Sequence, residues 1–513
     1  MKDVFLRSKL LLRIPYLFSI RFRMIHFQLS ICVILFTFVY TANSRCFRAA
    51  VYEEVAVGGN FADPKDEALD NLKVYKHVVK KASENGAEII VFPEHGLFPP
   101  FDRDTLLRYL EELPNEMGKV NPCEQRESSQ NSIQYQLSCL AKENRIYLVS
   151  NMGEVEYCDK KDAHCPADGR YQYNVAVAFD NKGYLIAKYR KYHLYGESDH
   201  FDFPEKQEFT TFETPFGKFG LFVCFDSLFK EPAIEMVEKY NITGLTLPTW
   251  WFNEMPFLVA HEYQQSIAMG ENINLLAANS NDPNLGSSGS GIYCGKKGAL
   301  VYTYNEKTVA PILSIATLNI NPNDDKEHCI PNAKKILIDV FKYIPEIADT
   351  AELSEKYKVP PLDVNVFNRI KLNKSNDEIK LCERETCCHI KYSINEFSLK
   401  EGYTYYFGAA DMIRPEELGQ WCEQMCVLYA YDESKKTYAD DVGSRFDYFK
   451  LSAKFATKYI FPSLMTNDMK LVPTNWWTFH KNGTNSYIET KRDVRVISSG
   501  LYGRCYDRDP KFH

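Results

Sequence analysis

Beyond its first 45 residues the sequence has no apolar run of the ~20 residues that a membrane-spanning helix needs. It has no excess of positive charge either, because 61 basic side chains face 68 acidic ones and the formal net charge is -7. Proteins that bind nucleic acid neutralise phosphates with lysine and arginine, so a nucleic-acid partner is not expected. Internal repeats and low-complexity tracts are also lacking. With 513 residues, 45% of them hydrophobic, the chain is expected to form two or three globular domains.

The first 44 residues have the composition of a signal peptide. Arg21 and Arg23 precede the apolar run Ile31–Tyr40, and small residues follow. We therefore expect a signal peptide over residues 1–44, or one that functionally begins at Met24. An uncleaved membrane anchor is the alternative, but the apolar run is shorter than the ~20 residues of a membrane span. The charged and aromatic stretch 500–513 lacks the apolar tail of a lipid-anchor signal, so a secreted, extracellular product without a stable membrane anchor is expected.

The chain then alternates short apolar strands with amphipathic helices, which indicates an α/β layered domain with helices on both faces of a sheet. Strands are expected at 48–57, 87–92, 146–151, 173–180, 184–190, 219–224, 244–248 and 275–278, and helices at 65–85, 129–143, 231–240 and 256–271. Composition turns polar at 319–331. We therefore predict a first domain at 45–320, a linker at 321–335, and a second domain at 336–513. The second domain is cysteine-rich and β-rich, with strands expected at 391–397 and 403–407.

Three reactive side chains follow the ends of apolar strands: Glu94, Lys191 and Cys224. Ligands collect at the carboxyl ends of strands in α/β sheets, so these side chains are candidates for one site. Considered one at a time, each has an ordinary structural explanation: Glu94 as a surface carboxylate, Lys191 as a solvated ammonium, and Cys224 as a buried thiol or half of a disulfide. Together they suit amide hydrolysis: a base activates the thiol for attack, and an ammonium and backbone N–H groups stabilise the oxyanion. We expect Glu94 to accept and return the proton.

The fifteen cysteines fit an oxidising compartment. Setting aside Cys32 in the signal and the nucleophile Cys224 leaves thirteen, so at least one more is unpaired or bonded between chains. Cys158 with Cys165 is a natural bridge, as are pairs within the group Cys382, Cys387, Cys388, Cys422 and Cys426. A zinc cluster in that group is the alternative, disfavoured because no doubled C-x-x-C spacing is present. Glycosylation is expected at three N-x-[ST] sequons, which begin at Asn241, Asn373 and Asn482.

Three stretches resemble the nitrilase superfamily, and within it the vanin and biotinidase branch. They are VFPEHG at 91–96, YRKYHLY at 189–195 and VCFDSLF at 223–229. Supporting stretches are PTWW at 248–251, AMG at 268–270, NLLAAN at 274–279 and GSGIY at 289–293. The resemblance covers most of residues 47–293, and the cysteine-rich remainder is similar to the C-terminal domain of vanins. Two departures from the best-known vanins are the missing lipid-anchor signal and a cysteine, Cys505, close to the end.

The resemblance implies a four-layer α-β-β-α sandwich and a catalytic triad. In it Glu94 is the proton acceptor, Lys191 the oxyanion stabiliser and proton donor, and Cys224 the nucleophile that forms a thioester. The backbone N–H of Phe225 is expected to join Lys191 at the oxyanion. No metal and no organic cofactor is implied, and the partner is a small-molecule amide. Vanins cleave pantetheine to pantothenate and cysteamine, whereas biotinidases release biotin from biocytin, and this choice stays open.

Four further side chains are candidates for lining the substrate site: Trp250 and Trp251 as an apolar wall, and His193 and Glu197 just beyond Lys191. Core packing is the competing role for the tryptophans, and a plain surface role for the other two. A binding protein that kept the fold and lost the reaction would lack a catalytic side chain, and all three are present. A cysteine protease that pairs Cys224 with His193 or His261 is disfavoured, because no papain-like or caspase-like flanking sequence occurs. Oligomeric state and disulfide connectivity stay open.

Overall fold

The computed structural model describes residues 46–55, 64–98, 102–125, 132–159, 161–305, 307–324, 329–343, 359–395, 402–416 and 419–512. The predicted signal peptide, including Cys32, lies outside the described residues. Within these described ranges no helix has both the length and the apolar character to span a bilayer.

The first sheet has seven strands in the order β13-β12-β1-β2-β3-β4-β5. Their bounds are β1 Cys46–Glu53, β2 Ile89–Val91, β3 Tyr147–Tyr157, β4 Arg170–Phe179, β5 Leu185–Arg190, β12 Ile312–Asn319 and β13 Lys334–Leu337. The pairs β1–β2 and β2–β3 are parallel, whereas β3–β4 and β4–β5 are antiparallel. Helix α2 (Pro64–Glu84) follows β1, and α4 (Ile133–Asn144) precedes β3. Parallel neighbours need such crossover connections, which is why helices alternate with these strands in the sequence.

The second sheet repeats this plan with the order β11-β10-β9-β8-β7-β6. Its strands are β6 Thr211–Thr214, β7 Gly217–Leu221, β8 Gly244–Pro248, β9 Asn274–Ala278, β10 Gly291–Cys294 and β11 Ala299–Tyr302. β7, β8 and β9 are parallel, and the outer pairs are antiparallel. Helices α5 (Glu235–Lys239) and α6 (Ala260–Glu271) connect the parallel strands.

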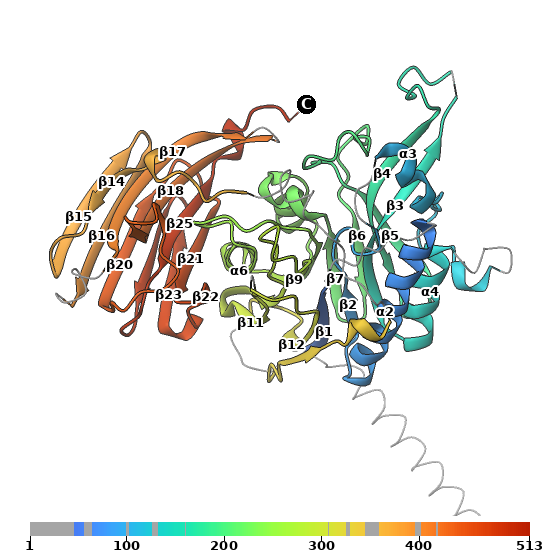
Figure 1. Cartoon of the computed structure of the whole chain (residues 1–513), viewed down its shortest axis with the longest axis horizontal. Helices are drawn as coiled ribbons and strands as arrows, with labels where there is room; N and C mark the ends of the chain where they lie inside the picture. The colour runs from blue at the N-terminus through green and yellow to red at the C-terminus, as the bar shows by residue number, and fades with distance from the viewer. Residues whose placement is uncertain are drawn as a thin grey trace, which may run out of the picture. The chain divides into compact units, whose positions relative to one another are not determined.

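The side chains of β1 show how the layers stack. Ala50 and Tyr52 join a buried cluster with residues of α2 and α4, whereas Ala49 and Val51 belong to the cluster that includes the second sheet. Because side chains alternate across a strand, the first sheet is covered on one face by helices and on the other by a sheet. Figure 1 shows α2 and α4 on one side of the two sheets and α6 on the other. The predicted α-β-β-α sandwich is confirmed.

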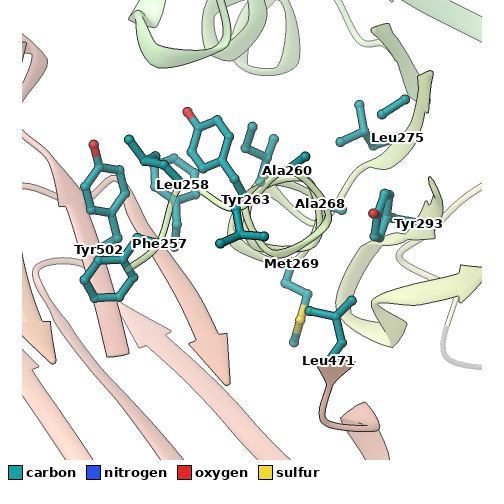
Figure 2. Packing of buried hydrophobic residues seen from close by; sticks show 14 of the residues in the cluster. Phe257, Leu258, Ala260, Tyr263, Ala268, Met269, Leu275, Tyr293, Leu471 and Tyr502 are labelled. Carbon is teal, nitrogen blue, oxygen red and sulfur yellow. The ribbon is translucent and has the colours of Figure 1, made fainter. Parts of the chain in front are cut away.

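Helix α6 is buried all round rather than along one stripe, since every residue from Ala260 to Gly270 is buried. Figure 2 shows Leu275 and Tyr293 of the second sheet on one side of α6 and Tyr502 on the other. Tyr502 belongs to β25 (Ser498–Arg504) of the C-terminal part. The Ser266 hydroxyl also donates to the Pro462 carbonyl at 2.7 Å. Helix α6 is therefore a layer shared by the sandwich and the C-terminal strands.

The C-terminal part consists of two antiparallel sheets (Figure 1). One has the order β14-β17-β18-β25-β21-β22, with β19 paired to β18, and the other the order β15-β16-β20-β24-β23. The remaining bounds are β14 Asn368–Lys371, β15 Asn376–Glu383, β16 Thr386–Ile394, β17 Thr404–Glu416, β18 Gly419–Asp432, β19 Thr437–Tyr438, β20 Phe446–Lys454, β21 Ile460–Thr466, β22 Lys470–Leu471, β23 Trp477–Asn482 and β24 Asn485–Thr490. The β-rich second domain that the sequence predicts is confirmed.

The cysteines of the C-terminal part form disulfides. The bridges are Cys123–Cys139, Cys158–Cys165, Cys382–Cys387, Cys388–Cys426 and Cys422–Cys505, and Cys46 and Cys329 are disulfide-bonded too. Cys388–Cys426 joins β16 of one C-terminal sheet to β18 of the other. The zinc alternative is wrong, because all five cysteines of that group are in disulfides. Of the described cysteines, only Cys224 and Cys294 are free, so the second unpaired cysteine is Cys294.

Some element boundaries differ from the sequence expectations. The helix expected at 256–271 begins at Ala260, whose N–H donates to the Asn253 side-chain oxygen at 2.7 Å. The strand expected at 219–224 ends at Leu221, because the chain turns before Cys224. The sequence predicts a linker at 321–335 and a second domain that begins at residue 336. In the structure, β13 pairs with β12 up to Leu337, so the first sheet extends through the predicted linker and past the predicted boundary. β13 is largely exposed and lysine-rich, so its composition resembles that of a linker.

Candidate active site

The structure brings the three strand-end side chains together. Glu94 follows β2, Lys191 follows β5 directly and Cys224 follows β7. All three line one pocket of about 260 Å³, together with His95, Tyr195, Glu197, Trp250 and Phe252. They come from both sheets, so the pocket lies where strand ends of the two inner layers meet.

Glu94 and Lys191 form a buried ion pair. The Lys191 ammonium donates to Glu94 Oε1 at 2.8 Å, and both side chains are almost fully buried. The Asn174 amide also donates to Glu94 Oε1 at 2.8 Å, and the Trp250 N–H donates to Oε2 at 3.1 Å. A carboxylate with three donors in fixed positions is held in one orientation, as a base that moves a proton over a short distance requires.

Glu197 is a second carboxylate on the same ammonium. It accepts from Lys191 through Oε1, while Oε2 bonds His95 Nε2 at 3.0 Å and accepts from Asn174 at 3.1 Å. Burial alone would raise the pKa of Glu197, but the Lys191 charge and the bond to His95 lower it to about 2. The Lys191 pKa is raised well above its usual value: burial opposes the charge, but Glu197 and Glu94 together outweigh that effect. Lys191 therefore stays charged across the physiological range.

Cys224 lies in a strained turn. Its φ is 44°, in the left-handed region that non-glycine residues rarely adopt. The buried carboxylate of Asp226 holds this turn: it accepts from the Val223 N–H at 3.2 Å, the His193 N–H at 3.0 Å and the Tyr189 hydroxyl at 3.0 Å. The turn, Cys224–Leu228, is a short 3-10 helix. Its hydrogen bonds fix where the thiol points.

Two further donors hold the far end of this turn. The Tyr263 hydroxyl on α6 donates to the Ser227 carbonyl at 2.8 Å. The Arg504 guanidinium, fully buried on β25, donates to the Leu228 carbonyl through Nε at 2.9 Å and through Nη2 at 2.6 Å. The C-terminal part thus contacts the nucleophile-bearing turn directly.

The thiol itself is protonated at rest. Burial raises the pKa of Cys224 well above its usual value, the negative charge of Glu94 raises it further, and the positive charge of Lys191 only partly opposes this. The sulfur lies 3.6 Å from the Trp250 carbonyl oxygen. A neutral thiol is a weak nucleophile, so attack at this site requires a base at that moment.

A second, larger pocket of about 450 Å³ continues from the first. The two share Tyr195, Cys224, Trp250 and Phe252. The remaining lining residues are Phe225, Leu228, Trp251, Glu254, Leu258, Val359 and Trp421. Its walls are mostly apolar and aromatic, with one carboxylate, which suits a small organic ligand.

The other residues predicted from sequence fall into two groups. Glu197 lines the smaller pocket, Trp251 the larger one and Trp250 both, and Phe225 follows Cys224 in the turn. His193 lines neither pocket: its ring stacks on Phe229 with centroids 3.8 Å apart, and its Nδ1 bonds Asp226 at 2.8 Å.

His261 lies away from both pockets, where its Nε2 bonds the Met469 carbonyl at 2.7 Å and its ring stacks on Tyr302. Neither histidine of the protease alternative therefore shares a pocket with Cys224, and that alternative loses its second catalytic group.

Sequence reasoning missed Asn174 and His95. Asn174 links Glu94 to Glu197, and its signal is a lone amide within the otherwise apolar inner half of β4. His95 directly follows Glu94 and bonds Glu197. One ligand atom each from Glu94, His95 and Glu197 lies within 4.8 Å of the others, a spacing that suits a metal ion. The Lys191 ammonium already donates to both carboxylates, so a cation of the protein itself holds the place between them.

Comparison with known proteins agrees with this geometry. Residues 55–252 match the carbon-nitrogen hydrolase family model, and residues 358–509 match the vanin C-terminal domain. The chain is 35% identical to the pantetheinase of Mus musculus over 90% of each chain, and 32% identical to that of Homo sapiens over 93% of each. It is 32% identical to the biotinidase of Takifugu rubripes over 86% of this chain and 89% of that protein. The chain therefore belongs to the carbon-nitrogen hydrolase, or nitrilase, superfamily, in its vanin and biotinidase branch.

Proposed function

We propose that the chain hydrolyses a linear carboxamide through a Cys224 thioester, and that its substrate is pantetheine, cleaved to pantothenate and cysteamine. The observation that carries the proposal is that Glu94, Lys191 and Cys224 line one pocket. There the Lys191 ammonium donates a hydrogen bond to Glu94, and the Cys224 thiol, whose pKa is raised, needs a base such as Glu94 to take its proton.

In the first half-reaction Glu94 takes the proton from Cys224 as the sulfur attacks the amide carbonyl carbon. The carbonyl π electrons move to oxygen, and the oxyanion is stabilised by Lys191 and by the backbone N–H of Phe225. Glu94 then gives its proton to the amide nitrogen, the C–N bond breaks, and the amine leaves. The acyl group remains on sulfur as a thioester.

In the second half-reaction Glu94 takes a proton from water as the oxygen attacks the thioester carbonyl. The same two groups stabilise the second oxyanion. The C–S bond breaks, the sulfur recovers a proton from Glu94, and the carboxylic acid departs. Because Glu94 accepts and returns a proton in each half-reaction, its orientation by Lys191, Asn174 and the Trp250 N–H matters twice.

Pantetheine is preferred as substrate because the pantetheinase of Mus musculus is 35% identical to the chain over 90% of its length. Biotin amides are the second candidate, because relatives named biotinidase are 31% and 32% identical. The test incubates purified protein with pantetheine and with biocytin side by side and measures released cysteamine and biotin. We expect cysteamine release that Cys224→Ala abolishes without changing the melting temperature by more than a few degrees. Release of neither product by protein with an intact thiol would remove the substrate assignment.

We also propose that the protein is secreted and glycosylated. Five disulfides between described cysteines favour an oxidising compartment. The three sequon asparagines, Asn241, Asn373 and Asn482, are all exposed, as glycosylated asparagines must be.

Expression in a secretory cell line tests this part. We expect the protein in the medium, with an N-terminus near residue 45 and a mass that falls in three steps under partial deglycosylation. Retention in the cytosol with residues 1–44 intact would contradict it.

A further inference from the structure

We infer that the larger pocket is the acyl-chain subsite of the proposed reaction, that Trp421 from the C-terminal part forms its far wall, and that Glu254 accepts a hydrogen bond from a hydroxyl or amide N–H of the acyl chain. The inference rests on the proposed function and specifies its substrate class. It also assigns the second domain a direct role in substrate recognition.

The direction of the substrate follows from the position of the base. Glu94 must protonate the departing nitrogen, so the amine lies toward the smaller pocket, which Glu94, Lys191 and Glu197 line. The reacting carbonyl lies at Cys224, which lines both pockets. The acyl chain then extends away from Glu94 into the larger pocket, which shares Cys224 with the smaller one and has mostly apolar walls.

Two parts of the chain build the wall of this subsite. Trp251 and Leu258 come from the sandwich, whereas Trp421 belongs to β18 and Val359 precedes the first C-terminal strand. The Trp421 ring also packs edge-on against Phe225, the neighbour of Cys224, with ring centroids 5.9 Å apart. Aromatic side chains bind apolar parts of a ligand with little loss of conformational freedom, so Trp421 is suited to the apolar part of the acyl chain.

Glu254 is the carboxylate of this pocket, and a fixed network holds it. Arg414 on β17 donates to Glu254 Oε1 and pairs with Glu423 Oε2 at 3.5 Å. The same Glu423 oxygen accepts from the Trp421 indole N–H at 3.1 Å, and the Arg414 guanidinium lies 5.2 Å from the Trp421 ring centroid. One arginine therefore orders both the acceptor and the aromatic wall before substrate arrives. A carboxylate has about four lone-pair directions, so Arg414 by itself does not occupy all the acceptor positions of Glu254.

The charge of this network defines the acyl chains that fit. Arg414 faces two carboxylates, Glu254 and Glu423, so the three side chains together carry a formal charge of -1. The two carboxylates disfavour a second carboxylate on the acyl chain, and the charge of Arg414 is already paired with both of them. The pocket thus selects neutral, partly aliphatic acyl chains with at least one hydrogen-bond donor.

The main experiment compares a long and a short amide with the same leaving amine: pantetheine and N-acetylcysteamine, or biocytin and Nε-acetyllysine if biocytin is the better substrate. We expect Trp421→Ala to raise KM for the long substrate about tenfold or more, because apolar contact is lost, while kcat/KM for the short amide changes less than threefold. Trp421→Phe restores most of the affinity. Trp476→Ala, at a half-buried tryptophan that lines neither pocket, is the matched control and leaves both substrates unchanged.

Glu254→Gln tests the hydrogen bond and the charge. Arg414 keeps its pairing with Glu423 in this variant, so folding is expected to be retained. Wild type is expected to prefer pantetheine over its analogue without hydroxyl groups by about tenfold, and Glu254→Gln to reduce that preference. N-succinylcysteamine, whose acyl chain is anionic, is expected to become a better substrate of the variant than of wild type.

A measurement independent of turnover uses alkylation of Cys224 by iodoacetamide, slowed by pantothenate or biotin. We expect Trp421→Ala to need about tenfold more of the protecting acid. Equal losses on long and short amides, or unchanged protection, would overturn the subsite. These outcomes differ from failure of the proposed function, in which wild type cleaves neither pantetheine nor biocytin.

Discussion

Arg504 on β25 donates two hydrogen bonds to the carbonyl of Leu228, the last residue of the turn that carries Cys224. The two residues are 276 positions apart. Arg504 is fully buried and its charge is matched by Asp509, which accepts from Nη2 at 2.9 Å. The second domain therefore helps to set the position of the nucleophile.

The first prediction concerns this contact. Arg504→Met removes both bonds to Leu228 and also breaks the ion pair with Asp509. Removing one partner of a buried ion pair costs about 3 to 5 kcal/mol of folding stability, and the freed turn adds a catalytic loss. We expect kcat to fall about tenfold or more at a temperature where the variant is still folded, measured against its own melting curve.

Asp509→Asn is the control for this prediction, because it weakens the same ion pair and leaves the bonds to Leu228 in place. A loss of stability with nearly normal kcat is expected there. If both variants lose kcat in proportion to stability, Arg504 supports folding alone and does not position the turn.

The second prediction concerns the triad. Lys191→Ala is expected to lower kcat by ~100-fold or more, because it removes an oxyanion donor. Glu94→Gln is expected to lower kcat by ~100-fold or more as well, because an amide cannot take the proton of a thiol whose pKa is raised. Steady-state kinetics with pantetheine measures both. Near-normal rates in the lysine variant would mean that its role is misassigned, and near-normal rates in the glutamine variant would favour a histidine base.

The third prediction concerns Glu197, whose pKa is lowered to about 2 by Lys191 and His95 against the effect of burial. A carboxyl with a lowered pKa contributes stability above its unfolded value near 4.5, and that contribution is lost as pH falls toward 2. The full contribution is of the order of 3 kcal/mol. Melting temperatures of wild type and Glu197→Gln should therefore differ most above pH 4.5 and converge toward pH 2. A difference that is constant with pH would contradict this assignment.

The fourth prediction concerns Glu262, whose pKa is raised, so that its contribution to stability is lost as pH rises. Burial on α6 raises the pKa of Glu262 to about 7, although hydrogen bonds from Ser463 and from backbone groups lower it in part. The protonated carboxyl stabilises the fold below pH 4.5, and this stabilisation is lost as pH rises through 7. The glutamine in Glu262→Gln does not titrate. The stability of the variant relative to wild type should therefore rise by roughly 3 kcal/mol from pH 5 to pH 8, and its melting temperature should rise relative to that of wild type over the same range. Parallel melting curves across that range would show that Glu262 is ionised throughout.

Much of the site could be predicted because its parts lie at strand ends. Glu94, Lys191 and Cys224 each follow a short apolar run, and the rule that ligands gather at the carboxyl ends of parallel strands brings such residues together. Two of these strands do have parallel partners: β2 pairs in parallel with β1, and β7 pairs in parallel with β8. The disulfide Cys158–Cys165 could be anticipated from its spacing, since both cysteines lie close in the sequence.

The rest depends on contacts that no local pattern encodes. Trp421 and Arg504 lie in strands that read as ordinary β sequence, and only the packing of α6 against β21 and β25 places them beside the nucleophile. From the sequence alone Glu254 would be predicted to be a surface carboxylate, because its partner Arg414 is 160 residues away. His193 lines neither pocket because it bonds Asp226, a buried carboxylate 33 residues further along the chain.

Helix α6 has no side that tolerates water, because Tyr263 and Met269 face neighbours on different sides (Figure 2). A fragment that ended at Leu337 would leave one flank of this helix bare, with Phe257 and Leu258 beside it. Such a bare apolar flank favours self-association over a soluble monomer. A truncation that removed the C-terminal strands would therefore expose this flank and would also remove Trp421 from the wall of the larger pocket.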